Sequence, residues 1–139
     1  MAKEYRAPTT LNKIVIWINR LGVGRSETLT TTGRSSGKPR EVPVSPIEVD
    51  GQEFLVAPYG EVSWVHNARA HPSVTLRSGG TARRCRLVEV THEAPHVVKA
   101  YWDKEKVSRP YMDVPGDGDV SDFGSVAGRF PVFRVEEEA

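Results

Sequence analysis

Short strand-like segments separated by tight turn signals restrict the fold of this chain more than any other feature of its sequence. Residues 27–32 read Glu-Thr-Leu-Thr-Thr-Thr, and the apolar alternation of residues 42–49 changes phase at Ser45-Pro46, which predicts a bend. Asp50-Gly51 is a two-residue hairpin signal, and Ser-Gly-Gly at residues 78–80 turns the chain again. Because the strands follow one another through hairpins and not through regular helical crossovers, the pattern favours an antiparallel sheet over a doubly wound parallel one.

Apolar residues at helical spacing mark three further segments. A leading helix is expected over residues 11–21, a short helix over residues 62–70, and another over residues 97–102. The sequence of 139 residues contains no repeat and no dividing linker, so residues 1–139 are expected to form a single domain. The fold class expected from these elements is mainly β (α+β): a small antiparallel barrel with an N-terminal helix and short connecting helices.

Composition restricts the partners and the location. A net charge of +1 gives no global basic field, so the sequence does not favour nucleic-acid binding. The single cysteine, Cys85, excludes an internal disulfide and fits a reducing compartment. No apolar run approaches a membrane span and no signal peptide precedes the first helix, so a cytoplasmic protein is expected. The first helix either packs across the domain or rests weakly on a membrane surface, and the sequence leaves both readings and the oligomeric state open.

The glycine-rich segment "TTTGRSSGKPREVPV", residues 30–44, carries three cations and resembles a phosphate-binding loop at first sight. A nucleotide P-loop needs four residues between its first glycine and its Gly-Lys pair, followed by Ser or Thr. Here three residues separate Gly33 from Gly37, and Pro39 stands at the hydroxyl position. The residues that follow favour a strand and not a helix. This segment is therefore interpreted as a hairpin turn or as a grip on another anion.

Two patterns imitate metal sites, and neither predicts one. His92-Glu93-Ala94-Pro95-His96 matches a zinc-protease pattern, but a proline lies inside the helix that the pattern requires. Residues 117–128 begin like a calcium loop, but they lack the glycine at the sixth position and the glutamate at the twelfth. No metal is expected.

The order of these elements resembles a known family. The Gly-Arg-x-x-Gly-x-Pro-Arg turn of residues 33–40 is followed by Val-Pro-Val, by "FLVAPYG" at 54–60, by "SWVHNARAHP" at 63–72 and by "GRFPVFRV" at 128–135. This combination, over roughly residues 9–135, is similar to the deazaflavin-dependent nitroreductase family of actinobacteria. The resemblance implies a split β-barrel fold and the use of the reduced 5-deazaflavin coenzyme F420.

The resemblance also implies a coenzyme site. It places Arg34, Lys38 and Arg40 on the phosphate and the glutamate tail. The residues implied around the ring and its neighbouring anion are Pro43, Val44, Ala57, Pro58, Trp64, Asn67 and Arg69. The implied substrate contacts are Ser45, Tyr59 and Tyr111, and no catalytic acid is named. Several relatives carry a basic residue and a longer insertion where this chain has Tyr-Gly-Glu, so coenzyme use transfers better than substrate.

These observations lead to one principal function and two alternatives. The principal hypothesis is an oxidoreductase that passes a hydride from F420 to a small electron-poor acceptor such as a quinone, an activated alkene or a nitroaromatic. One alternative is a carrier that binds deazaflavin, another flavin, haem or a lipid without turnover. The other keeps the chemistry with FMN in place of F420.

Overall fold

Seven strands dominate the computed structural model, which describes residues 27–105, 112 and 128–138. The strands are β1 (Glu27–Thr32), β2 (Pro39–Val44), β3 (Ile47–Val49), β4 (Gln52–Val56), β5 (Ser73–Ser78), β6 (Thr81–Glu89) and β7 (Val132–Glu137). The helices are α2 (Ser63–Ala70) and α3 (Pro95–Lys104), with a short 3₁₀ turn η1 (Thr91–Glu93) before α3. Every paired strand runs antiparallel to its neighbour, so the expected antiparallel, mainly β fold is confirmed. The expected leading helix lies outside the described residues.

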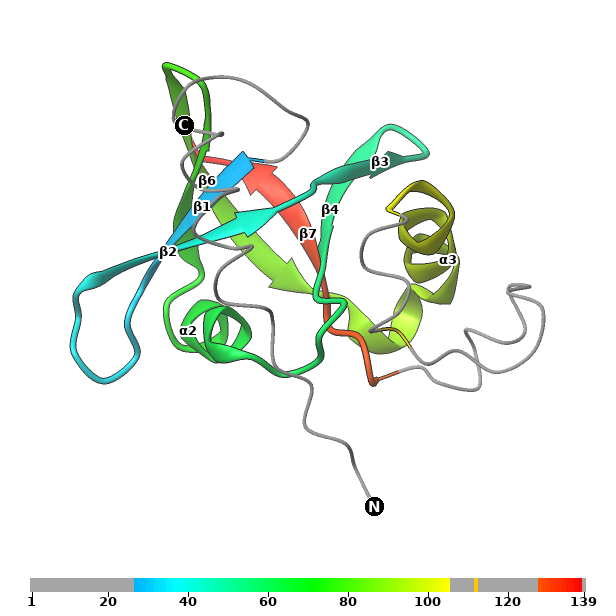
Figure 1. Cartoon of the computed structure of the whole chain (residues 1–139), viewed down its shortest axis with the longest axis horizontal. Helices are drawn as coiled ribbons and strands as arrows, with labels where there is room; N and C mark the ends of the chain where they lie inside the picture. The colour runs from blue at the N-terminus through cyan, green and yellow to red at the C-terminus, as the bar shows by residue number, and fades with distance from the viewer. Residues whose placement is uncertain (1–26, 106–111, 113–127, 139) are drawn as a thin grey trace.

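The sheet curls because its two end strands are almost continuous in sequence. The strands follow the order β2-β1-β5-β6-β7-β4-β3, which puts β2 and β3 at opposite ends. Only Ser45 and Pro46 separate these two strands, so the Cα atoms of Val44 and Ile47 are at most about 11 Å apart. At this bend the chain leaves β1 and pairs with β4 instead (Figure 1). The predicted bend and the split β-barrel are thereby confirmed.

The β3–β4 hairpin shows how the local sequence fixes the register. Asp50 has φ of 53° and Gly51 has φ of 78°, so both turn residues adopt the left-handed conformation that a type I′ turn requires. Val49 and Gln52 pair across this turn. The predicted two-residue hairpin is confirmed.

Side chains of the barrel point alternately to an interior cluster and to an outer face. The interior cluster joins strand residues from around the barrel to α2; its largest members include Leu29, Leu55, Trp64, Val65, Leu76, Leu87 and Phe133. A second cluster covers the outer face of β3, β4 and β7 with α3; its members include Ile47, Phe54, Val56, Val97, Val98, Tyr101 and Val132. Strand β4 therefore buries both faces, which explains its continuous apolar run.

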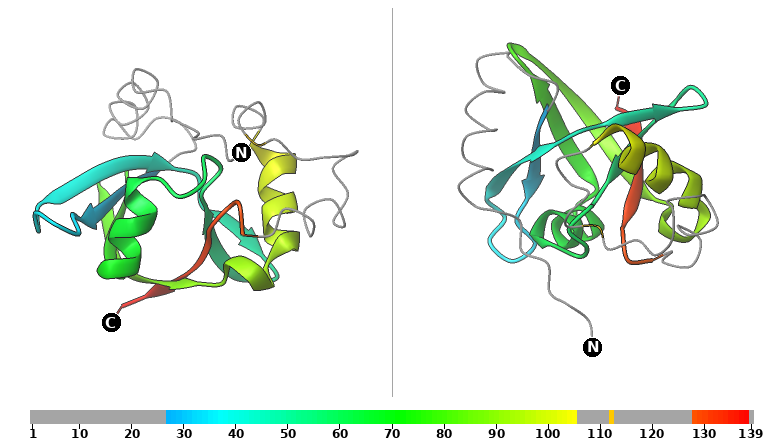
Figure 2. Two further views of the ribbon diagram at one scale, coloured as in Figure 1. Left: turned by 90° about the horizontal axis from the view of Figure 1, so that it is seen from below. Right: turned by 45° about the vertical axis from the view of Figure 1, so that its right-hand side comes forward.

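Helix α2 lies across one end of the barrel, as the view from below shows (Figure 2, left). An eight-residue helix is unstable in isolation, so its position depends on burial of its apolar side chains. Trp64 is 6% exposed and its ring centroid lies 5.5 Å from that of Phe133. Neither α2 nor α3, the helices within the described residues, is long and apolar enough to cross a membrane.

Candidate functional site

The glycine-rich segment forms the turn between β1 and β2. The Gly33 N–H donates to the Lys38 carbonyl at 2.8 Å, and the Gly37 N–H donates to the Gly33 carbonyl at 2.9 Å. Gly37 has φ of 70°, a conformation that L side chains rarely adopt. The chain continues from this turn into β2 and not into a helix, so the geometry of a nucleotide P-loop is not formed.

Arg34 is fixed to helix α2 by neutral oxygen atoms. Its backbone N–H donates to Asn67 Oδ1 at 3.1 Å, and its side-chain Nη1 donates to the same oxygen at 2.9 Å. Nη1 also donates to the Ser63 carbonyl at 3.4 Å. The amide of Asn67, which is 3% exposed, donates from Nδ2 to Thr31 Oγ1 at 3.2 Å. These contacts orient the guanidinium without neutralising it.

The turn concentrates positive charge without carboxylate partners. Arg34, Lys38 and Arg40 are all exposed, and none of them forms an ion pair with any described residue. Guanidinium and ammonium groups in this state bind phosphate and carboxylate oxygens through charge-assisted hydrogen bonds. The turn is therefore chemically suited to an anionic ligand.

Arg69 differs from these three cations because its charge is compensated. Its Nε and Nη2 donate to the two carboxylate oxygens of Glu89 at 2.9 and 2.8 Å, and its Nη1 donates to Glu61 Oε1 at 2.6 Å. The hydrogen bond from Arg69, and a second from Thr91, hold the pKa of Glu89 below its ordinary value, although burial opposes this shift. The structure thus places Arg69 in a network that joins α2 to β6, apart from the unpaired cations.

The apolar residues predicted around a ring come from two strands. Pro43 and Val44 are half-buried on β2. Among the described strands β2 lies at one end of the hydrogen-bonded order, so one of its backbone edges is outside this ladder. Ala57 and Pro58 are buried where the chain leaves β4. Ala57 is anchored through its N–H, which donates to the Pro131 carbonyl at 2.8 Å.

The remaining predicted residues have different environments. Trp64 packs inside the barrel against Phe133, where it supports the position of α2. Ser45 lies in the bend between β2 and β3, and Tyr59 follows β4; both are half-buried. Tyr111 lies outside the described residues.

Sequence reasoning missed two oxygens of the Arg34 network: Thr31 Oγ1, which accepts from Asn67, and the Ser63 carbonyl, which accepts from Arg34. Thr31 is 2% exposed, and Ser63 contributes only its carbonyl. The inward phase of Thr31, two residues after Leu29, was the one available signal, because a buried hydroxyl requires a hydrogen-bond partner. A backbone carbonyl leaves no signal in the sequence.

The two metal-like patterns have distinct outcomes. His92 lies in η1 and His96 lies in α3, so the two histidines do not share one regular helix. Among the described residues, no group of three or more His, Cys, Asp or Glu side chains is placed to hold a metal ion. Residues 117–127 of the calcium-like segment lie outside the described residues.

A curled antiparallel sheet whose end strands, β2 and β3, are joined by the Ser45-Pro46 bend defines the class of the protein as a split β-barrel. Residues 15–114 match the family model described as F420H(2)-dependent quinone reductase. Because this match spans more than half of the chain, the protein belongs to that family, as the resemblance predicted. It is accordingly an oxidoreductase whose coenzyme is F420.

Several solved structures are similar to this chain. A protein of unknown function from Agrobacterium tumefaciens str. C58 is similar with a TM-score of 0.58 and 18% identity; the match covers 99% of this chain and 60% of that chain. The haem storage protein HutZ from Vibrio cholerae has a TM-score of 0.57 and 10% identity over 83% of this chain and 82% of its own. An F420-H2 dependent reductase is 27% identical with a TM-score of 0.47 over 81% of this chain and 94% of its own. At these identities, the first two likenesses show the fold alone.

Proposed function

We propose that the protein reduces a small electron-poor acceptor with F420 bound between the β1–β2 turn and the ends of β2 and β4. A quinone is the first acceptor class to test, and activated alkenes and nitroaromatics are the others. The observation that carries the proposal is the set of three cations, Arg34, Lys38 and Arg40, that have no carboxylate partner among the described residues. Their charge fits a coenzyme whose phosphodiester and glutamate tail are anionic.

Arg34 is the strongest anion-binding residue in this proposal. Its guanidinium is held by Asn67 and Ser63 before any ligand arrives, so less side-chain freedom is lost on binding. Asn67 acts through Arg34 as a positioning residue. Lys38 lies on the same turn and Arg40 is the second residue of β2; both add charge, but no described contact orients their side chains.

The ring of the coenzyme is assigned to Pro43, Val44, Ala57 and Pro58. The backbone edge of β2 can hydrogen-bond ring heteroatoms because it lies outside the ladder, and the buried end of β4 supplies an apolar floor. Trp64 supports this floor through α2, while Ser45 and Tyr59 are assigned to the acceptor. When bound, the reduced coenzyme supplies the hydride; the protein contributes orientation and exclusion of water.

Three further assignments complete the proposal. The free, buried thiol of Cys85 fits the reducing cytoplasm, where we propose that the protein acts. Tyr111 remains a proposed acceptor contact. Arg69 is assigned to the α2–β6 network and not to the coenzyme.

The proposal is tested by titrating the apoprotein with F420 and, separately, with FMN, and then assaying a quinone analogue with reduced F420. We expect saturable F420 binding, weaker FMN binding, and oxidation of reduced F420 that depends on both protein and quinone. Tight binding without turnover across quinones, activated alkenes and nitroaromatics would identify a carrier instead. Failure to bind F420 would refute the placement of the site.

A further inference from the structure

Strands β1 and β5 separate before either strand ends. Their ladder stops at Thr30 and Thr75, although β1 continues to Thr32 and β5 begins at Ser73. A cavity of about 200 Å³ opens in the gap; its lining residues are Thr30, Thr31, Thr32, Gly37, Pro39, Ser73, Val74, Thr75 and Arg84. This volume holds a carboxylate or phosphate group together with several waters, since one water occupies about 30 Å³.

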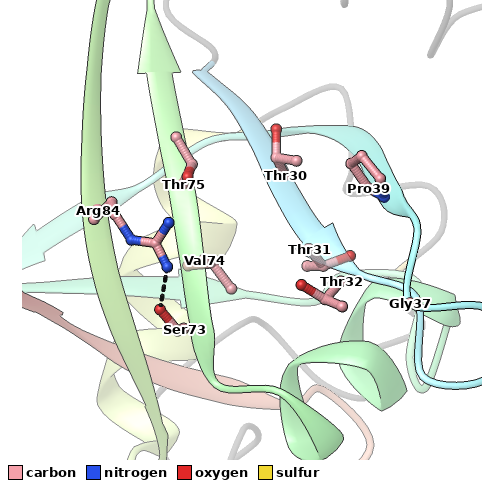
Figure 3. A pocket seen from close by; sticks show the side chains of 9 residues that line it. All are labelled: Thr30, Thr31, Thr32, Gly37, Pro39, Ser73, Val74, Thr75 and Arg84. Carbon is pink, nitrogen blue, oxygen red and sulfur yellow. Dashed lines mark hydrogen bonds between the residues drawn. The ribbon is translucent and has the colours of Figure 1, made fainter.

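The lining is rich in hydrogen-bonding groups and carries one cation. The close-up shows threonines of β1 on one side of the gap and Ser73, Thr75 and Arg84 on the other (Figure 3). Arg84 Nη2 donates to Ser73 Oγ at 2.9 Å, which brings the guanidinium to the β5 side of the gap. Among the residues that the structure describes, no Asp or Glu side chain lines the cavity. Hydroxyls around a guanidinium match the acceptor oxygens of an anion.

Glu138, a carboxylate within the described residues, competes for Arg84 without saturating it. Glu138 Oε2 lies 3.8 Å from Arg84 Nε and accepts a hydrogen bond from Ser73 Oγ at 3.1 Å. The Arg84 side chain is 67% exposed, so this ion pair contributes little to stability and can be exchanged for another anion.

We propose that the gap between β1 and β5 is a second oxyanion site, in which Arg84 and the surrounding hydroxyls bind a carboxylate or a phosphate. Gly37 and Pro39 belong both to this lining and to the β1–β2 turn, so the site adjoins the cations of the coenzyme site. Two sources supply such a group: the distal end of the glutamate tail of the coenzyme, or a free anion. The first source rests on the proposed function, and the second does not.

Arg84→Gln is the test variant, and Arg86→Gln is its matched control. Arg86 is the next outward-facing residue of β6, is exposed and does not line the cavity, so its substitution removes the same charge nearby. Dissociation constants are measured for F420 with several glutamates and with none. In parallel, inorganic phosphate is titrated while the amide signals of Thr30 and Thr75 are followed by NMR.

If the glutamate tail occupies the site, F420 with several glutamates should bind wild type more tightly than F420 with none. Arg84→Gln should reduce this gain in affinity about tenfold, whereas Arg86→Gln should preserve it. Glu138→Gln should increase the gain, because it removes the competing carboxylate. A free-anion source predicts phosphate shifts at Thr30 and Thr75 that Arg84→Gln abolishes, with no effect of tail length. The proposal is overturned if Arg84→Gln and Arg86→Gln behave alike in both arms. Absence of F420 binding to wild type would instead refute the proposed function, and the phosphate arm would still decide this site.

Discussion

The two ends of the barrel interior use arginine in opposite ways. At the end away from α2, Arg83 binds both carboxylate oxygens of Glu53 at 2.6 Å, and Glu27 and Glu137 lie within 3.4 and 3.7 Å of it. At the end covered by α2, Arg34 is held by an amide oxygen and a backbone carbonyl. One guanidinium is surrounded by negative charge, and the other is oriented but uncompensated.

This difference separates a structural cation from one available to a ligand. The hydrogen bond with Glu53, and the charges of Glu53 and Glu27, raise the pKa of Arg83 above its ordinary value although burial opposes this. Both Nη groups of Arg83 therefore already face carboxylate oxygens of described residues. The hydrogen-bond partners of Arg34 are neutral oxygens, so they do not compensate its positive charge. Charge compensation, more than exposure or sequence neighbourhood, therefore distinguishes the arginine that the proposed function assigns to the ligand from the arginine held by carboxylates.

The largest expected effect is on stability, at the end of the barrel where Arg83 is held by carboxylates. Arg83→Met leaves Glu27, Glu53 and Glu137 facing one another, so we expect a loss of about 2 kcal/mol in the free energy of unfolding. Urea denaturation measures it. Adding Glu53→Gln should recover part of the loss, and the F420 dissociation constant should change less than twofold. A large loss of F420 affinity in folded Arg83→Met would show that Arg83 also contributes to coenzyme binding, which contradicts a purely structural role.

The next effect concerns ligand binding at the other end. Arg34→Ala removes a hydrogen bond to a charged group worth about 1.5–3 kcal/mol, so the dissociation constant for F420 should rise roughly ten- to a hundredfold. Turnover at saturating coenzyme should change much less, because the contact is equal in ground and transition states. Isothermal titration and steady-state kinetics measure the two quantities.

Arg77→Ala is the control for Arg34→Ala, because it removes an exposed cation from β5 that forms no ion pair among the described residues. It should bind F420 like wild type. Equal weakening by both substitutions would mean that net charge, and not the oriented Arg34, determines affinity.

Arg69 extends the comparison to a third arginine. Because the folded-state pKa of Glu89 lies below the unfolded value of about 4.3, this pair stabilises the protein above that pH, and the stabilisation is lost as pH falls through the folded pKa. Glu89→Gln should lose about 1 kcal/mol at pH 7 and show a shallower decline in stability between about pH 5 and 3. Glu48→Gln, at an exposed position of β3, should follow the wild-type curve. If the free energy of unfolding falls with pH equally steeply in Glu89→Gln and in wild type, the ion pair between Arg69 and Glu89 does not stabilise the protein.

The smallest expected effect is on the reactivity of Cys85, which lies at the same end of the barrel as Arg83. Cys85 is fully buried beside Arg83, and burial raises the pKa of its thiol more than the arginine lowers it. Iodoacetamide should therefore leave the folded protein unmodified and add one group after unfolding, as mass spectrometry would show. Rapid modification of the folded protein would indicate that this end opens in solution.

The local features of the fold were predictable because neighbouring residues determine them. Asp50-Gly51 specified its hairpin through φ angles that few other residue pairs adopt, and Ser45-Pro46 specified a bend through a phase change and a missing N–H. The closure of the sheet at that bend could not be predicted in the same way, because it depends on which strands pair with one another, and local sequence does not specify strand pairing.

The site was only partly predictable because its contacts join distant residues. The cations of the turn were visible in the sequence, but Arg34 and Asn67 are 33 residues apart. Arg69 looked equivalent to Arg34 until the fold brought Glu89, 20 residues away, beside it. Sequence identifies charged groups well, whereas their compensation depends on tertiary structure.

The central claim is that Arg34 binds the coenzyme because its partner Asn67 is neutral, and Asn67→Asp tests it most directly. This substitution places a carboxylate beside Arg34, so that Arg34 is compensated as Arg83 is, while the arginine itself is unchanged. We expect the F420 dissociation constant to rise about tenfold with no loss of unfolding free energy at pH 7, and only a small further effect in the Arg34→Ala background. A stable Asn67→Asp protein that binds F420 like wild type would contradict the account.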